Sequence, residues 1–299
     1  MRFLQTLGIR AASLLLRNSP FETGRYRLIH TFLPQLRSRG AEMGAVTVRT
    51  RHGFRFEAYL NDWLGQYVYL TGTYEPATAA LFERLVAPGS TVLDLGANAG
   101  FFSLLSARLA GPGGRVIAFE PAPRVRQRLS RNIELNDFGN IRIMACCVSD
   151  GPGEVTLHEG PENHTGISSM RPIEAESGSI LVPAVAVDSL LDEISTVSLV
   201  KIDVEGAELM ALKGLKGLLA RDKPSLIVEI TDTYLRAFGD NAPALAEWMS
   251  EQGFSGFRID EGALTPLSLA ELDRKSQFNA LFVADRKRET LLATMTIRR

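Results

Sequence analysis

The regular alternation of short apolar runs with helical stretches, from about residue 90 onward, constrains the fold of this chain more than any other feature. Such alternation is typical of βαβ units, whose helices cover a parallel sheet. The apolar runs predict strands at residues 91–95, 115–119, 141–148, 197–202, 225–230, 254–259 and 280–285. The stretches between them predict helices at residues 101–110, 123–136, 206–220 and 242–252. We therefore expect an α/β domain in which a mostly parallel seven-stranded sheet carries helices on both faces.

One connection in this pattern does not have the character of a helix. After Asp150 the turn-forming sequence Gly151-Pro152-Gly153 precedes a short strand-like run, and the chain returns to the regular pattern at Asp188. This segment predicts a β-hairpin with an exposed loop, inserted into the α/β pattern. Insertions near strand ends often shape a binding pocket.

The first 55 residues carry ten arginines and two glutamates, although the whole chain has a net charge of −1. The near-neutral total excludes a protein that binds polyanions through bulk charge alone. The basic segment has several interpretations: contact with an anionic substrate, a nucleic acid or a lipid surface, or a solvated face. We assign residues 1–58 to an N-terminal Arg-rich extension with helical and β structure. Residues 59–299 form the main domain, with its core at 72–235.

Two local features bear on the location of the protein. The apolar run at residues 11–16 is too short to span a membrane, and it predicts an amphipathic helix that packs on the domain or rests on a membrane surface. Cys146 and Cys147 are adjacent and lack the spacing of a zinc site. Since neighbouring strand residues point to opposite faces, we expect reduced core cysteines rather than a disulfide. Together these features favour a cytoplasmic protein.

The sequence "VLDLGANAGFFS" at residues 92–103 predicts a strand, a tight turn and the start of a helix. Its glycines, Gly96 and Gly100, let the backbone pass close to a ligand, and the helix start offers free N–H groups. The spacing G-x-x-x-G lacks the central glycine of a dinucleotide fingerprint, which disfavours an NAD-dependent oxidoreductase. Glu120, which ends the next strand, can accept hydrogen bonds from a ribose diol. Asp94 lies inside an apolar strand, so its carboxylate needs a partner: loop N–H groups or a cofactor's ammonium. An ordinary turn-capping role is the alternative.

Four stretches of the chain carry a resemblance to a known family: "DLGANAG" (94–100), "AFEPAPRVRQRLSRNIELN" (118–136), "VKIDVEGAELMALKG" (200–214) and "PSLIVEI" (224–230). In this order they resemble the FkbM-type S-adenosylmethionine-dependent methyltransferases, and the upstream "GTYEP" (72–76) also matches. The resemblance covers roughly residues 60–235. It implies a class I, Rossmann-like methyltransferase fold and O-methylation of a hydroxyl on a small molecule, sugar or glycolipid.

The resemblance also implies which residues bind the cofactor, S-adenosylmethionine. The glycine loop would line its methionine half, the acid after the next strand would hold the ribose, and the pair after the third strand would lie by the adenine. For Asp150 simple turn chemistry is an alternative, and Glu75 either closes over the cofactor or caps the helix that begins near Pro76. The expected cofactor-binding residues are Glu75, Asp94, Gly96, Ala97, Asn98, Gly100, Phe101, Glu120, Pro121, Ser149 and Asp150.

A cluster of charged residues at the end of the strand 197–202 gives the expected catalytic site. Buried strands do not normally carry such groups unless they emerge into a cleft. In the fold that the resemblance implies, this strand ends beside the cofactor's sulfonium, so we expect Lys201, Asp203 and Glu205 to be catalytic. Asp203 would position or deprotonate the acceptor hydroxyl, and Lys201 would lower the acceptor's pKa or pair with a carboxylate. Glu205 and Glu208 are placed in the first turn of the following helix, where carboxylates are favoured.

Other functions are open alternatives: an RNA methyltransferase that uses the Arg-rich segment, or a non-catalytic S-adenosylmethionine-binding protein. No recognised RNA-binding module is visible, so we do not expect a nucleic acid partner. Asp203, Glu205 and Glu229 are hard oxygen ligands that would suit Mg²⁺. They lack the Asp-Asp-Asn pattern of metal-dependent methyltransferases, so we predict no metal. The favoured partner is an anionic or glycan-bearing small acceptor, with peripheral membrane contact through the N-terminal segment as a further possibility.

Overall fold

The structure, a computed structural model, describes residues 44–160, 168–172, 178–268 and 277–293, and six residues of the N-terminal part: 11, 13, 14, 17, 33 and 36. Most of the Arg-rich extension lies outside the described residues, as does the greater part of the exposed loop of the hairpin. The division of the chain at residue 58 stays a prediction. Within the described part, no helix is both long enough and apolar enough to cross a membrane.

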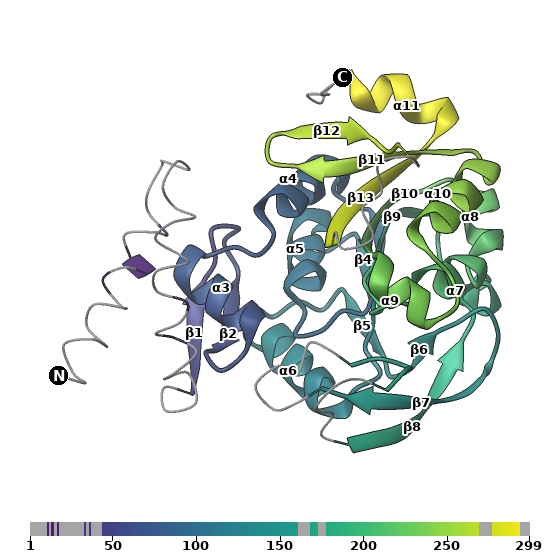
Figure 1. Cartoon of the computed structure of the whole chain (residues 1–299). Helices are drawn as coiled ribbons and strands as arrows, with labels where there is room; N and C mark the ends of the chain where they lie inside the picture. The colour runs from purple at the N-terminus through teal and green to yellow at the C-terminus, as the bar shows by residue number, and fades with distance from the viewer. Residues whose placement is uncertain are drawn as a thin grey trace.

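The predicted α/β fold class is confirmed, because five neighbouring strands of the main sheet run parallel and helices cover both faces (Figure 1). The strand order is β12-β11-β13-β10-β9-β3-β4-β5, in which β13 is antiparallel to both of its neighbours. The strands are β3 (Thr91–Leu95), β4 (Arg115–Phe119), β5 (Ile141–Met144), β9 (Val197–Ile202), β10 (Ser225–Thr231), β11 (Phe254–Asp260), β12 (Ala263–Pro266) and β13 (Gln277–Ala284).

Helices pack on the two faces of this sheet through separate apolar clusters (Figure 1). One face is covered by α4 (Pro76–Leu85), α5 (Phe101–Ala110) and α6 (Pro123–Glu134). The other face is covered by α7 (Glu208–Lys213), α8 (Lys216–Asp222), α9 (Asp232–Ala237) and α10 (Ala242–Glu251), and α11 (Asp285–Leu292) follows β13. The central strands are therefore buried on both sides, which explains why they consist of nearly continuous apolar residues.

Two smaller sheets flank the main one. The predicted hairpin insertion consists of the antiparallel strands β7 (Gly153–Glu159) and β8 (Gly178–Val185), which form a three-stranded sheet with β6 (Cys147–Val148). The short 3-10 helix η1 (Val187–Leu190) leads from β8 back toward the main sheet. Near the N-terminus, β1 (Ala45–Arg49) and β2 (Arg55–Tyr59) form a hairpin next to α3 (Trp63–Thr71). Apolar residues of this hairpin belong to the same core cluster as α4 and α5.

Three predictions about the elements are wrong in detail. Within the described residues the sheet has eight strands instead of seven, because β12 adds an edge strand that pairs with β11. The strand predicted at 141–148 is two strands, since β6 leaves the main sheet and pairs with β8. The helix predicted at 206–220 is divided into α7 and α8. The carboxylate of Asp188 accepts the backbone N–H groups of Gly217 and Leu218 at 2.6 and 2.9 Å, so it caps the start of a new helix.

Candidate active site

A cavity of about 380 Å³ opens at the carboxyl ends of the parallel strands. β3 pairs with β4 on one side and β9 on the other, so the cavity lies where the chain switches direction across the sheet. Ligands bind at such switch points in open α/β sheets. One side of the cavity, which we call the glycine-loop side, is formed by Gly96, Asn98, Glu120 and Pro121. The opposite side, the acid side, is formed by Asp203, Glu205 and Glu229.

The backbone of the glycine loop is fixed by positive φ angles and close packing. Gly96 has a φ of +80°, and a Cβ at this position would overlap the carbonyl oxygen of Asp203. The loop therefore packs directly against the chain that follows β9, which only glycine permits. Asn98 also has a positive φ, of +52°, and its side chain accepts the N–H of Ala99 at 2.7 Å. The close packing of Gly96 against Asp203 places the glycine-loop side next to the acid side.

The carboxylate of Glu120 is held by backbone N–H groups. Its two carboxylate oxygens accept the N–H groups of Asn98 and Ala122, both at 2.9 Å, and the residue is 5% exposed. Burial raises the pKa of Glu120 to about 7, although these N–H groups favour the charged form. Each oxygen keeps a second lone pair, so the carboxylate can still accept hydrogen bonds from a ligand in the cavity.

Lys201 and Asp203 form an ion pair at the end of β9. The distance from Lys201 Nζ to Asp203 Oδ2 is 2.7 Å, and Lys201 is 2% exposed. The ammonium also lies 5.0 Å from the centroid of the Phe102 ring, within range of a cation–π contact. Burial by itself lowers the pKa of Lys201, but Asp203, Glu75 and Asp94 raise it above its ordinary value, so Lys201 stays charged. Burial opposes the charge on Asp203, yet Lys201 holds the pKa of this carboxyl below its usual range.

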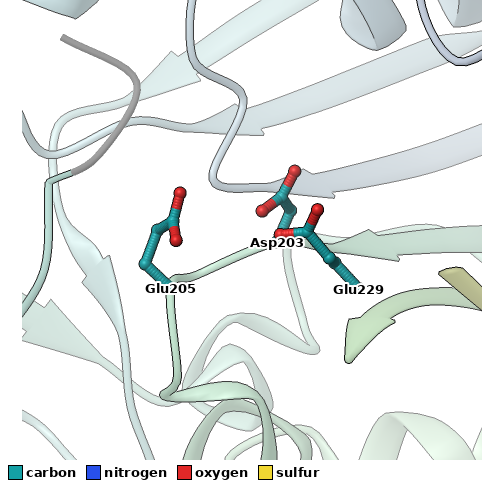
Figure 2. Close-up of side chains that lie close together, drawn as sticks. All are labelled: Asp203, Glu205 and Glu229. Carbon is teal, nitrogen blue, oxygen red and sulfur yellow. The ribbon is translucent and has the colours of Figure 1, made fainter. Parts of the chain in front are cut away.

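The carboxylates of Asp203, Glu205 and Glu229 face one another across the acid side (Figure 2). One oxygen from each lies within 4.8 Å of the other two. Figure 2 shows the Glu229 carboxyl directly beside that of Asp203, whereas Glu205 approaches from the loop that follows. Burial, together with the charge and hydrogen bond of Asp203, raises the pKa of Glu229 to about 10, so Glu229 is protonated at neutral pH. Glu229 also accepts a hydrogen bond from Gln277 Nε2 at 2.8 Å.

The sequence predicted Glu205 and Glu208 in the first turn of one helix, but the structure separates them. Glu205 precedes the helix in a left-handed conformation, with a φ of +52°, and α7 begins at Glu208. Glu208 is buried, and its Oε1 accepts the N–H groups of Gly206 and Val204 at 3.0 and 3.3 Å. Glu208 therefore holds the loop in place. Glu205 lines the cavity, where burial and then Asp203 raise its pKa well above the ordinary value.

The predicted cofactor residues fall into two groups. Gly96, Asn98, Glu120 and Pro121 line the cavity. The other predicted residues are not part of the lining, and their role in cofactor binding stays a prediction: Glu75, Asp94, Ala97, Gly100, Phe101, Ser149 and Asp150.

Specific contacts account for the positions of this second group. Asp94 is 1% exposed and accepts the hydroxyl of Ser103 at 2.6 Å, behind the cavity. Phe101 is buried in a cluster of aromatic rings that includes Phe54 and Phe102. Glu75 stands at the N-cap position of α4 but makes no capping bond there, and its carboxylate accepts Asn279 Nδ2 at 2.7 Å.

The two residues predicted to lie by the adenine do not line the cavity, and their contact with the adenine stays a prediction. Ser149 is buried and Asp150 is exposed, and neither lines the cavity, whereas the preceding Cys146, Cys147 and Val148 do. Both cysteines are free, as predicted. Burial, with a smaller effect of Glu120, raises the pKa of the Cys147 thiol to about 12, so this thiol stays protonated. The cysteines therefore offer the cavity an apolar wall.

Several lining residues had no signal in the sequence. Trp63 comes from α3, Tyr234 from α9 and Gln277 from β13, and each is distant in the chain from the motifs. Tyr74, from the "GTYEP" stretch, also lines the cavity. Aromatic rings beside polar groups are a common lining for sites that orient organic ligands.

The three acids of the acid side also have the chemistry of ligands for a hard divalent cation. However, the Lys201 ammonium already lies 2.7 Å from Asp203 and supplies positive charge there. In the structure, the cation that contacts Asp203 is therefore the ammonium of Lys201. The absence of a metal stays a prediction from the sequence.

Comparison with known proteins gives a consistent result. The family model described as "Methyltransferase FkbM domain" matches residues 94–255. The chain is 33% identical to methyltransferase sdnD of Sordaria araneosa, over 42% of this chain and 60% of that protein. It is 30% identical to 31-O-demethyl-FK506 methyltransferase FkbM of Streptomyces tacrolimicus, over 43% and 60%. It is 29% identical to hexuronic acid methyltransferase AglP of Haloferax volcanii, over 46% and 54%. The chain thus spans little more than half the length of these relatives.

Proposed function

The chain belongs to the FkbM methyltransferase family, and we propose that it transfers the methyl group of S-adenosylmethionine to a hydroxyl of a small-molecule or glycan acceptor. Membership confirms the family predicted from the sequence, and S-adenosylmethionine is the cofactor of that family. The relatives' names indicate different acceptors, a hexuronic acid and a demethylated FK506. The choice of acceptor therefore has to be argued from the cavity.

The observation that carries the proposal is the division of one cavity into two sides with different chemistry. On the glycine-loop side, backbone N–H groups fix Glu120 with lone pairs to spare. On the acid side, Asp203 is ionised and paired with Lys201. The volume of about 380 Å³ lies within the usual range for ligand sites, roughly 300–1,000 Å³. These residues fit the cofactor: Glu120 would hold its ribose, and Gly96 and Asn98 would pass beside its methionine portion.

When bound, the cofactor supplies a methyl group on a positively charged sulfur. The protein's task is to hold the acceptor oxygen in line with that methyl group, and good alignment can contribute roughly 7–11 kcal/mol. Asp203 would accept a hydrogen bond from the acceptor hydroxyl and receive its proton as the oxygen gains the methyl group. Because its pKa is lowered, Asp203 is suited to orienting the hydroxyl before it takes the proton.

Lys201 and Glu229 would support Asp203 from two directions. Lys201 keeps the carboxylate ionised and in one orientation through its 2.7 Å contact. The protonated Glu229 carboxyl donates to Asp203 without adding a second negative charge. Glu205 would contact the acceptor from the loop, because its carboxyl faces the same space (Figure 2).

The charge of the cavity favours an uncharged acceptor over the anionic one that the sequence suggested. The described lining contains no lysine or arginine, and its acids are Asp62, Glu120, Asp203, Glu205 and the protonated Glu229. The described cations beside this lining are engaged: Lys201 and Arg128 pair with Asp203 and Asp62, and Arg126 Nη1 donates to the backbone carbonyl oxygens of Glu120 and Pro121. A carboxylate or phosphate at the acid side would meet carboxyl groups without a free cation. For the same reason the cavity does not favour RNA.

A cytoplasmic location stays a prediction from the unpaired cysteines.

Calorimetry and a radiolabelled methyl donor would test the proposal. S-adenosylhomocysteine should bind and NAD should not. Label should pass to uncharged glycosides and polyols in preference to uronic acids. Binding of S-adenosylhomocysteine without methylation of any hydroxyl compound would favour the non-catalytic alternative, and binding of NAD would contradict the proposal.

A further inference from the structure

A second hollow, of about 320 Å³, lies far from the active site and is lined by arginines. Its basic residues are Arg49, Arg55 and Arg108, and its single acid is Asp137. α5 and α6 begin beside the cavity and run away from it, and the hollow lies where both helices end. A helix of ten residues is about 15 Å long, so roughly that distance separates the hollow from the glycine loop.

The three arginines line one hollow and outnumber its single acid. Arg49 and Arg55 are directly opposite in the register of β1 and β2, so their side chains stand on the same face of the hairpin. Arg108 reaches the same hairpin from α5: a Cβ on Gly53 would lie 2.7 Å from its Nη2. Among the residues that the structure describes, none of the three has an ion-pair partner.

This arrangement costs stability in the absence of a ligand. Like charges directly opposite on paired strands are destabilising. The negative end of the α5 dipole favours one cation in the last turn, which accounts for Arg108. It does not account for Arg49 and Arg55, which belong to the hairpin. A bound anion would remove the repulsion among all three.

The framework of the hollow is held by specific hydrogen bonds. Asn136, just after α6, accepts the N–H of Arg55 and donates to its carbonyl oxygen, both at 2.7 Å. These two bonds fix the backbone of β2 relative to α6, so the position of Arg55 does not depend on a ligand. Three guanidinium groups against one carboxylate leave two positive charges, which match a phosphate dianion. Arginine binds phosphate oxygens through paired N–H donors.

We propose that Arg49, Arg55 and Arg108 form a binding site for a phosphate group, distinct from the methyl-transfer cavity. The ligand is either a free phosphorylated small molecule or the phosphate of a lipid headgroup. Two of its arginines, Arg49 and Arg55, belong to the Arg-rich N-terminal segment, and Arg108 comes from α5.

Calorimetric titration with inorganic phosphate in low-salt buffer tests the proposal. The wild type should bind saturably, and the Arg49→Gln/Arg55→Gln variant should bind at least about tenfold more weakly, because it loses hydrogen bonds to a charged group. Arg286→Gln is the matched control, since Arg286 is exposed on α11 and outside the hollow. Equal phosphate affinity in the wild type and the double variant, or no saturable binding, would overturn the proposal.

Vesicles distinguish the two sources of the phosphate. Sedimentation with phosphatidylcholine vesicles that contain phosphatidic acid, lost in the double variant and kept in Arg286→Gln, assigns the site to a lipid headgroup. Phosphate binding without sedimentation assigns it to a free phosphorylated ligand. The urea stability of the ligand-free double variant gives an independent readout. It should equal or exceed that of the wild type, whereas a purely structural role for these arginines predicts a loss.

Discussion

The two sides of the active-site cavity treat their carboxyl groups differently. On the glycine-loop side, the one carboxylate, Glu120, is satisfied by backbone N–H groups whose positions the chain fixes. On the acid side, three carboxyl groups share one ammonium, so their protonation states depend on one another. The first arrangement suits binding of a constant ligand part. The second suits a step in which a proton moves, because its groups can exchange charge without rearranging the backbone.

The largest expected effect is on turnover, from the acid side. Asp203→Asn should lower kcat by about 10²- to 10⁴-fold, because the amide cannot take the hydroxyl proton. The dissociation constant for S-adenosylhomocysteine should change little, since the glycine-loop side is intact. Steady-state kinetics and calorimetry on the same preparation measure both quantities.

The matched control for this variant is Asp192→Asn, an exposed acid outside the cavity, which should behave like the wild type. Near wild-type turnover in Asp203→Asn would contradict the role of the acid side in the chemistry.

The next largest effect is expected on the binding of S-adenosylhomocysteine, from a substitution on the glycine-loop side. Glu120→Gln should weaken S-adenosylhomocysteine by about 10- to 100-fold, because hydrogen bonds to a charged acceptor are lost. At saturating cofactor, kcat should fall much less than in Asp203→Asn. Glu134→Gln, an exposed acid at the end of α6, serves as control in the same titration. If Glu120→Gln loses turnover but keeps its affinity for S-adenosylhomocysteine, the assignment of binding to the glycine-loop side and of proton transfer to the acid side is wrong.

A third effect is the pH dependence of stability on the acid side. The folded protein keeps a proton on Glu229 up to about pH 10, whereas the unfolded chain releases it near pH 4.5. Raising the pH through this window therefore lowers the free energy of unfolding of the wild type. Glu229→Gln does not titrate, so its stability relative to the wild type should increase between about pH 5 and pH 8. Urea unfolding across this range measures the difference, and a pH-independent difference would show that Glu229 titrates normally.

A small effect is expected for a residue next to the cavity that does not line it. Asp150→Asn should change the affinity for S-adenosylhomocysteine less than about twofold, because substitutions of exposed side chains usually have small effects. Calorimetric titration of Glu120→Gln under the same conditions gives the reference for the loss of affinity. A loss comparable to that of Glu120→Gln would support the adenine contact predicted from the sequence and would contradict the view that Asp150 lies outside the binding site.

The smallest expected effect is that of a chelator. Lys201 already supplies a positive charge at Asp203, so EDTA should leave the methylation rate unchanged. Loss of activity with EDTA that Mg²⁺ restores would assign a metal to Asp203, Glu205 and Glu229.

The sequence predicted the elements that carry the site better than the residues that complete it. Strands β3, β4 and β9 were predicted at their observed bounds, because strands buried on both faces are short continuous apolar runs. β12 was missed, since four residues ending in Pro266 at a sheet edge carry little pattern. Glu120 and Asp203 could be placed because each follows a predicted strand at the same sheet edge.

The remaining site residues depend on tertiary packing. Tyr234 and Gln277 reach the cavity from α9 and β13, and no local pattern relates them to the motifs. Asp94, inside β3, was also expected to bind the cofactor, yet its carboxylate accepts the hydroxyl of Ser103 and does not line the cavity. The alternation of a strand tells which residues share a face but not which face borders the cavity. That choice is made by the helices that pack on each side.

The most direct test of this account is the position of a bound product. A crystal structure with S-adenosylhomocysteine should show the ribose hydroxyls at the carboxylate of Glu120 and the sulfur on the side of Asp203. A ligand bound outside this cavity, or one whose sulfur lies away from Asp203, would contradict the assignment of binding to one side and methyl transfer to the other.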